Sequence, residues 1–290
     1  MRSLLPFAFV IAAFAQDPLI SVDTLATQLE DPNLVILHVG SPTDYAAGHI
    51  PGARLVTLAD ISVTGAMANG ERTLRLEMPP TDKLQAALLK LGIANASKVV
   101  IYAANDSVQS ATRVWFTFDY VSLPASLLDG GLAAWKAKEF KTSTEPTGFA
   151  AATATALKLT PRPEQIVDAA WLNAHRTDPG LVILDARLPE FYTGENSGQM
   201  PRAGHIAGAW NLPFPNLLTP SKQFIPLKQL AEHLGNGSTI VTYCHIGQQA
   251  TVLYFAARLT GKNVKLYDGS FQDWSSRPDL PVATKPLATK

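Results

Sequence analysis

The chain contains a single cysteine, Cys244, in the stretch VTYCHIGQQATVLYFAARLTG. A β-branched run, Thr239–Tyr243, ends immediately before it, and an apolar helical pattern begins a few residues later, at Gln248–Leu259. In open parallel α/β sheets, ligands bind beyond the carboxyl ends of the strands. The N-terminus of the following helix would stabilise a thiolate at that place and would bind a small anion. We therefore predict that Cys244 is a catalytic nucleophile.

The residues around this thiol are candidates to bind an anionic substrate through backbone N–H groups and fixed charges. The candidate substrate-binding residues are His245, Ile246, Gly247, Gln248, Gln249, Arg187 and Arg202. His245 is a candidate donor or cation because its ring titrates near neutral pH. For Arg187 and Arg202 the alternative is a structural ion pair with Asp or Glu, and the sequence leaves both interpretations open.

The cysteine belongs to a chain in which strands and helices alternate. Predicted strands are Leu34–Val39, Lys98–Tyr102, Leu181–Ala186 and Thr239–Tyr243. Predicted helices include Ser21–Glu30, Thr81–Leu91, Val167–His175, Leu227–Leu234 and Gln248–Leu259. Continuous apolar strands that alternate with amphipathic helices predict an α/β fold, with a parallel central sheet and helices on both faces.

The pattern occurs twice. The first copy contains LVILHVGSPTDYAAGHIPGA (34–53), VVIYAANDSVQSATRVWF (99–116) and LLDGGLAAW (127–135), and the second contains LVILDARLPEFYTGENSGQMPRAGHIAGA (181–209), TIVTYCHIGQQATVLYF (239–255) and LYDGSFQDW (266–274). Three matched blocks in the same order indicate a duplicated domain, because the period is far too long for a solenoid. We predict a first domain at 16–141, a linker at 142–160 and a second domain at 161–290. The linker is rich in Thr, Ala and Pro, which favours an extended chain.

The first residues resemble a secretory signal peptide. Arg2 precedes the apolar run Leu4–Phe14, and Ala13-Phe14-Ala15 fits a cleavage site before Gln16. The alternative is a buried N-terminal strand or helix. We predict removal of residues 1–15 and an exported protein, periplasmic or secreted, with no integral membrane span afterwards.

Composition limits the remaining classes of function. Of the 290 residues 47% are hydrophobic, and 24 Lys and Arg balance 24 Asp and Glu. This predicts a packed globular core and provides no argument for a nucleic-acid partner. The six histidines are dispersed and no second cysteine exists, so we predict no metal site and no internal disulfide. We also predict no cofactor, because no Gly-rich nucleotide loop follows a strand.

The chain resembles the tandem-domain rhodaneses, the thiosulfate/3-mercaptopyruvate sulfurtransferase family. The matching motifs are Gly48-His49-Ile50-Pro51-Gly52-Ala53, Asp185-Ala186-Arg187, Gly204-His205-Ile206-Ala207-Gly208-Ala209, the Cys244 loop, and the two Asp-Gly-x-x-x-x-Trp endings at Asp129 and Asp268. The resemblance implies two rhodanese-like domains with catalysis only in the second. Ala103 occupies the cysteine position of the first domain, which we interpret as an inactive partner that walls one side of the site.

The resemblance also implies the reaction. The thiolate would take a sulfane sulfur from a small anionic donor such as thiosulfate and become a persulfide, and a thiophilic acceptor, cyanide or a thiol, would remove it. This chain departs from the family in two places. The loop after Cys244 lacks both the paired basic residues associated with thiosulfate and the Gly-(Ser/Thr)-Gly pattern associated with 3-mercaptopyruvate. Phe191 lies where related enzymes often carry a substrate-binding arginine.

Three alternatives are weighed against a thiosulfate sulfurtransferase. A 3-mercaptopyruvate sulfurtransferase differs only in its donor. Phosphatases that share this fold need an arginine six residues after the cysteine to bind phosphate, and here that residue is Ala250. A non-catalytic binding or sulfur-relay module would not need Cys244. Outside the site, we predict that His49 and His205 fix turns and that Arg113 and Arg258 are structural.

Overall fold

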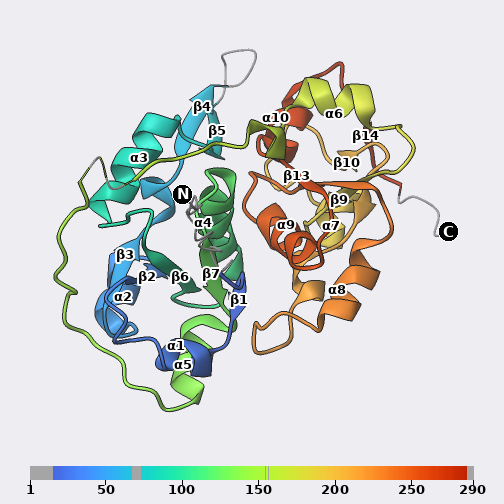
Figure 1. The fold of residues 1–290 in the computed structure, drawn as a ribbon. Coiled ribbons are helices and arrows are strands. Elements are labelled where there is room, and N and C mark those ends of the chain that lie inside the picture. The colour runs from blue at the N-terminus through green and yellow to red at the C-terminus, as the bar shows by residue number, and fades with distance from the viewer. Residues whose placement is uncertain (1–15, 67–72, 154, 156, 286–290) are drawn as a thin grey trace, which may run out of the picture.

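A computed structural model of the chain describes residues 16–66, 73–153, 155 and 157–285 (Figure 1). Two α/β domains lie side by side, and each is built on a five-stranded sheet whose paired strands are all parallel. The predicted fold class is therefore confirmed. The predicted signal peptide, residues 1–15, lies outside the described residues.

The sheet of the first domain has the strand order β1-β7-β6-β2-β3. These strands are β1 (Leu19–Ile20), β2 (Leu34–Val39), β3 (Ala53–Val56), β6 (Lys98–Ala103) and β7 (Ala125–Leu128). Its helices are α1 (Val22–Ala26), α2 (Pro42–Ala47), α3 (Thr81–Lys90), α4 (Val108–Tyr120) and α5 (Gly131–Ala137). An antiparallel hairpin, β4 (Val63–Ala66) and β5 (Thr73–Glu77), projects from this domain toward the second one.

The second domain repeats this plan with the strand order β11-β9-β12-β13-β8. The strands are β8 (Ile166–Val167), β9 (Leu181–Asp185), β11 (Trp210–Asn211), β12 (Thr239–Tyr243) and β13 (Val264–Tyr267). The helices are α6 (Ala169–His175), α7 (Pro189–Thr193), α8 (Leu227–Leu234), α9 (Ala250–Leu259) and α10 (Ser270–Ser276). A short antiparallel pair, β10 (His205–Ile206) and β14 (Val282–Ala283), lies apart from the sheet.

Alternation along the strands explains why helices cover both faces. In β2, Val35 and Leu37 belong to the core shared with α3 and α4, whereas Ile36 belongs to the core under α1 and α5. Successive side chains of a strand point to opposite faces, so a strand buried on both faces is apolar at every position. The second sheet follows the same rule, with Ile240 on the α9 side and Val241 on the α10 side.

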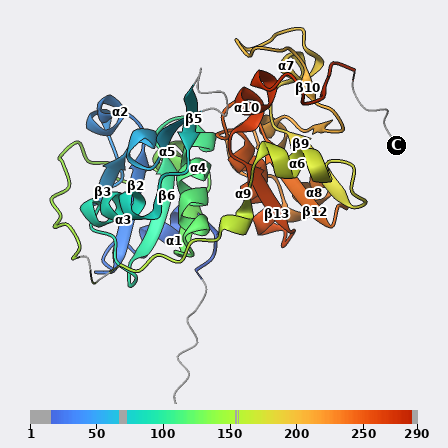
Figure 2. The same ribbon diagram turned by 90° about the horizontal axis from the view of Figure 1, so that it is seen from above.

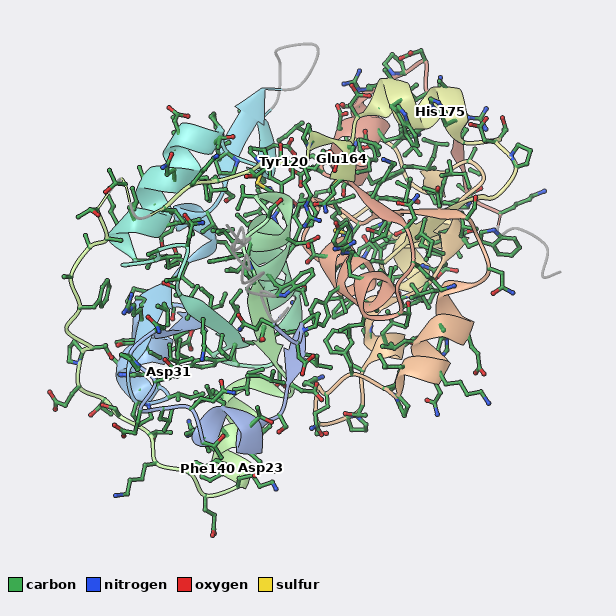
Figure 3. The ribbon with its side chains drawn as sticks, in the orientation of Figure 1. Asp23, Asp31, Tyr120, Phe140, Glu164 and His175 are labelled. Carbon is green, nitrogen blue, oxygen red and sulfur yellow. The ribbon has the colours of Figure 1, made fainter. Side chains whose placement is uncertain are left out.

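The two domains share one hydrophobic core across the seam between α4 and α9, which face each other in both ribbon views (Figures 1 and 2). Trp115 of α4 packs edge-on against Phe255 of α9 with ring centroids 4.6 Å apart, and Phe116 packs in the same way on Tyr254 at 4.8 Å. Figure 3 shows side chains filling this seam, with Tyr120 beside Glu164 at one end of it. Packing of this kind fixes one domain against the other.

The chain between the domains follows the outside of the first domain (Figure 1). His49 exchanges two backbone hydrogen bonds with Ser143, and Gln85 Nε2 donates to the carbonyl of Leu157. Asn95 Oδ1 accepts from the N–H of Lys158 at 2.6 Å. The segment is extended, as its composition predicts, but these bonds attach it to the domain surface.

Four of the five predicted helices are longer than the observed α1, α3, α6 and α9, and the shortening of α1 and α9 has a local cause. Ser21 caps α1 by accepting from the N–H of Thr24, and the helix ends at Ala26 instead of reaching Glu30. Gln248 and Gln249 precede α9, which begins at Ala250, because the backbone there is occupied by the loop around the cysteine. The observed strands β2 and β12 have the predicted bounds.

Candidate active site

Cys244 lies directly beyond the carboxyl end of β12, the middle strand of the second sheet, and is only 1% exposed to solvent. Its N–H donates to Ser270 Oγ at 3.2 Å, and its carbonyl accepts from the N–H of Phe271 at 3.0 Å. Ser270 is a non-glycine residue with φ 51°, in the left-handed region, so the turn that carries its hydroxyl is strained. Both backbone groups of the cysteine are thus fixed by α10.

The loop after the thiol presents free hydrogen-bond donors. In the described part of the chain, the backbone N–H groups of residues 245–249 have no hydrogen-bond acceptor. Thr251 and Val252, one turn later, donate to the carbonyls of Gln248 and Gln249. Five consecutive unpaired N–H groups next to a helix N-terminus are suited to bind an anion, and anion binding by this loop stays a prediction.

Arg187 is the fixed positive charge beside this loop. It follows β9, which pairs with β12 so that Asp185 lies opposite Tyr243, and the parallel strands end at the same edge. The fully buried guanidinium donates to Asp185 at 2.6–3.1 Å and to the carbonyl of Gly204 at 2.8 Å, and it stacks on Phe271 at 4.2 Å. Its Nη1 has no partner among the described residues, so one donor remains for a ligand.

The guanidinium of Arg187 keeps its positive charge although it is buried. Burial alone lowers the pKa of an arginine, but the Asp185 carboxylate outweighs it and raises the pKa of Arg187 above its ordinary value. The Cys244 sulfur acts in the same direction. Of the two interpretations that the sequence left open for Arg187, the ion pair is observed, and the unpaired Nη1 is compatible with substrate binding, which stays a prediction.

His245 is a neutral group in this site. Burial, assisted by the charge of Arg187, lowers its pKa to about 4. Its ring meets the edge of Phe191 with centroids 4.6 Å apart, and its Nε2 is buried without a partner among the described residues. This low pKa argues against the prediction that His245 supplies a cation near neutral pH, and a role as a neutral donor stays a prediction.

Arg202 has a different environment from Arg187. Its guanidinium donates to four backbone carbonyls, those of Trp274, Ser275, Arg277 and Leu280. These bonds hold the end of α10 and the turn that follows it. The contacts of Arg202 are therefore structural. Its partners are backbone carbonyls, whereas the sequence suggested Asp or Glu carboxylates.

The matching region of the first domain has none of this chemistry. Ala103 ends β6 at the place of the thiol, and His38 and Gly40 lie where the second domain has Asp185 and Arg187. His38 Nδ1 is 2.7 Å from the Tyr102 hydroxyl, and burial, assisted by the charge of His49, lowers the pKa of His38 to about 4. Among the described residues, this region has neither a thiol at the position of Ala103 nor an arginine at the position of Gly40.

Comparison with known proteins agrees with this geometry. The family described as rhodanese-like domain matches residues 21–138 and 168–277. The chain belongs to the rhodanese family. Over 92% of its length it is 31% identical to a probable 3-mercaptopyruvate sulfurtransferase of Pseudomonas aeruginosa, of which it covers 98%. Over 93% it is 30% identical to a thiosulfate sulfurtransferase of Azotobacter vinelandii, again covering 98%.

The fold of this rhodanese also matches solved structures. The crystal structure of YnjE superimposes with a TM-score of 0.82 at 21% sequence identity, over 93% of this chain and 69% of that one. This likeness concerns the fold alone. With the relatives above, it identifies the protein as a tandem rhodanese-like sulfurtransferase of the thiosulfate/3-mercaptopyruvate family.

The two Gly-His-Ile motifs of the sulfurtransferase stabilise turns, as predicted. His49 Nδ1 is 2.9 Å from the carbonyl of Tyr45 and stacks on that ring, and His205 Nδ1 is 2.7 Å from the carbonyl of Tyr192 and stacks likewise. Asp129 and Asp268, which the sequence places at the domain ends, instead hydrogen bond across the seam.

Two findings concern what the described residues lack. They contain no cluster of three or more His, Cys, Asp or Glu side chains able to hold a metal ion. No helix within them is both long enough and apolar enough to cross a bilayer.

Two side chains near the loop were missed by the sequence analysis. Arg113 of α4 was interpreted as structural, yet it crosses the seam to the carbonyl of Gly247 in the cysteine loop. Glu77 of β5 faces Asp268 and Arg113, with its Oε1 buried and without a partner among the described residues. No sequence pattern points to either, because both act through contacts between domains.

The pH dependence of protein stability tests the burial of Glu77 between the two domains. Burial, reinforced by the negative charge of Asp268, raises its pKa from 4.5 to about 8. Between these values the unfolded chain releases this proton and the folded chain retains it, so the contribution to stability is complete below pH 4.5 and declines as pH rises to 8. Glu77→Gln should therefore be more stable than wild type at pH 8, by roughly 1–2 kcal/mol, and the difference should shrink toward pH 5.

Urea unfolding of both proteins at pH 5 and pH 8 measures this difference, with Glu30→Gln as an exposed control. If Glu77→Gln raised the free energy of unfolding equally at both pH values, the raised pKa of Glu77 would be contradicted.

Proposed function

We propose that this sulfurtransferase moves a sulfane sulfur from thiosulfate to cyanide or a thiol through a persulfide on Cys244. The thiolate attacks the outer sulfur of thiosulfate, the sulfur–sulfur bond breaks, and sulfite leaves with the bonding pair. The acceptor then attacks the outer persulfide sulfur and returns the thiolate. Covalent catalysis divides a difficult transfer into two displacements.

The observation that carries this proposal is the run of unpaired N–H groups at 245–249 beside a buried thiol. Together with the unpaired Nη1 of Arg187, whose charge acts on Cys244 and His245, these donors suit a dianion with oxygens at one end. Preorganised donors of this kind stabilise the charge that develops on the leaving group in the transition state.

The donor 3-mercaptopyruvate is the second candidate, since a relative that carries this name is as similar as the thiosulfate enzyme. Loss of sulfur from mercaptopyruvate leaves an enolate that must take up a proton, whereas sulfite leaves as a stable anion. The loop supplies no acidic proton donor at neutral pH, because its glutamines do not titrate and the pKa of His245 is about 4. This favours thiosulfate.

Steady-state kinetics with both donors and cyanide as acceptor decides between them. We expect kcat/KM for thiosulfate to exceed that for 3-mercaptopyruvate by about tenfold or more, because proton transfer by a positioned acid contributes at least 10²-fold where it exists. A higher kcat/KM for 3-mercaptopyruvate would reverse the assignment of the donor.

We further propose that the enzyme is exported and that residues 1–15 are removed. Gln16, the first residue after the cleavage pattern, already belongs to the fold: its Nε2 donates to the carbonyl of Val99 at 2.8 Å and to Ser126 Oγ at 2.9 Å. Cleavage before Gln16 would leave these contacts intact. N-terminal sequencing of the protein from its native host should begin at or next to Gln16, and a retained Met1 in the exported fraction would refute export by cleavage.

A further inference from the structure

The seam between the domains has a local two-fold symmetry. Thr112 of α4 and Thr251 of α9 occupy equivalent positions in the two repeats, and their hydroxyls are 2.8 Å apart, fully buried. Each domain also offers an aspartate to a backbone N–H of the other. Asp268 accepts from Met78 at 2.8 Å, and its counterpart Asp129 accepts from Phe224 at 2.9 Å.

One position breaks this symmetry. Arg113, the residue after Thr112, corresponds to Val252, the residue after Thr251, and both side chains are fully buried. The arginine in the first domain faces the cysteine loop of the second domain. The valine occupies the equivalent position in the second domain, and the first domain has Ala103 where the second has the thiol. The arginine therefore occurs in the helix that contacts the Cys244 loop, at the carbonyl of Gly247.

The guanidinium of Arg113 connects three segments. Its Nη1 donates to the carbonyl of Gly247 at 3.3 Å and to Asp268 Oδ1, and its Nη2 donates to the carbonyl of Leu76 and to Asp268 Oδ2, the latter at 3.3 Å. Only a planar fork with several donors can make all of these bonds at once.

The fit at Gly247 is close. Gly247 has φ +77°, and a Cβ at this position would lie 2.9 Å from Asp268 Oδ1 and 3.1 Å from Arg113 Nη1. The loop backbone is thus pressed against the ion pair without space between them. Because Gly247 lies within the run of free N–H groups, the position of its peptide fixes the direction of the donors on either side of it.

We infer that Arg113 is a positioning residue for sulfur transfer: from the domain without a nucleophile it holds the Cys244 loop in the geometry that points its N–H groups at the reacting sulfur. This inference rests on the proposed function of that loop. It would also give the first domain a role in catalysis, since a detached second domain would lack this contact.

The test compares variants that keep the seam filled. Arg113→Lys retains a charge opposite Asp268 but cannot reach Gly247 and Leu76 at the same time. The double variant R113M/D268N removes both charges and keeps a side-chain oxygen at position 268 that can accept from the N–H of Met78. Arg258→Met is the control, because Arg258 pairs across the seam with Asp119 at 3.3 Å, and its hydrogen bonds among the described residues do not include the Cys244 loop.

Two measurements are made on each full-length protein: kcat/KM with thiosulfate and cyanide, and the pH profile of Cys244 alkylation by iodoacetamide. We expect Arg113→Lys and the double variant to lose about tenfold or more in kcat/KM and to shift the alkylation profile to higher pH. Arg258→Met should change neither. Alkylation needs no sulfur donor, so it tests the positioning of the loop even if wild type fails to use thiosulfate.

Each outcome decides the inference. Folded Arg113 variants with the alkylation profile and kcat/KM of wild type would overturn it. Equal losses in Arg258→Met would overturn it too, because any loosening of the seam would then suffice. If neither Arg113 variant folds, Arg113 is a stability residue and the inference fails.

Discussion

Cys244→Ser should abolish sulfur transfer while the fold persists. We expect kcat with thiosulfate and cyanide to fall by about 10³-fold or more, since the variant has no atom that can form and release a persulfide. A serine hydroxyl fits the space of the thiol and can retain the turn, whose contacts are made by the backbone of Cys244 with α10. The rate of thiocyanate formation and the thermal midpoint are the two quantities to measure.

The first domain provides a matched control for this loss. A second cysteine at the equivalent position, in the variant C244S/A103C, should not restore transfer. His38 and Gly40 replace the Asp185–Arg187 pair there, so that the new thiol would have no fixed cation beside it. Recovery of transfer in this variant would show that a loop thiol alone suffices and that the surroundings of Cys244 contribute little.

Arg187→Lys should weaken donor binding strongly. Among the described residues, Nη1 of this guanidinium has no hydrogen-bond partner, and a hydrogen bond to a charged group is worth about 1.5–3 kcal/mol. Loss of that bond corresponds to a KM for thiosulfate that is higher by roughly tenfold or more. Lysine keeps a positive charge against buried Asp185, which limits the cost in stability.

Arg202→Lys is the comparison, because the guanidinium of Arg202 is occupied by four carbonyls. We expect its KM for thiosulfate to remain within about twofold of wild type, with any effect confined to stability. A KM that rises in Arg202→Lys and not in Arg187→Lys would exchange the roles of the two arginines.

Local sequence pattern was sufficient to predict most of the framework. The β-branched runs of β2 and β12 define buried strands with the observed bounds, because strands buried on both faces are apolar throughout. The duplication, the cysteine after β12 and the turn histidines also follow from residues near one another in the chain. Helix ends were less certain, since the first turn of α9 depends on how the loop before it is held.

Features that depend on contacts between distant segments could not be predicted. Arg187 and Arg202 have equal standing in the sequence, and only the surrounding carbonyls and carboxylate distinguish them. The low pKa of His245 arises from burial beside Phe191 and Arg187. Arg113 resembles any arginine within an apolar helix until α4 is placed against the cysteine loop.

Intact mass after incubation with thiosulfate tests the central claim most directly. The wild-type protein, handled without reductant, should gain the mass of one sulfur atom, lose it on addition of cyanide, and show no gain when Cys244 is replaced by serine. Because Cys244 is the only cysteine in the chain, the site of any added sulfane sulfur is unambiguous. A wild-type protein that turns over thiosulfate without this gain, or a serine variant that acquires it, would contradict a persulfide on Cys244.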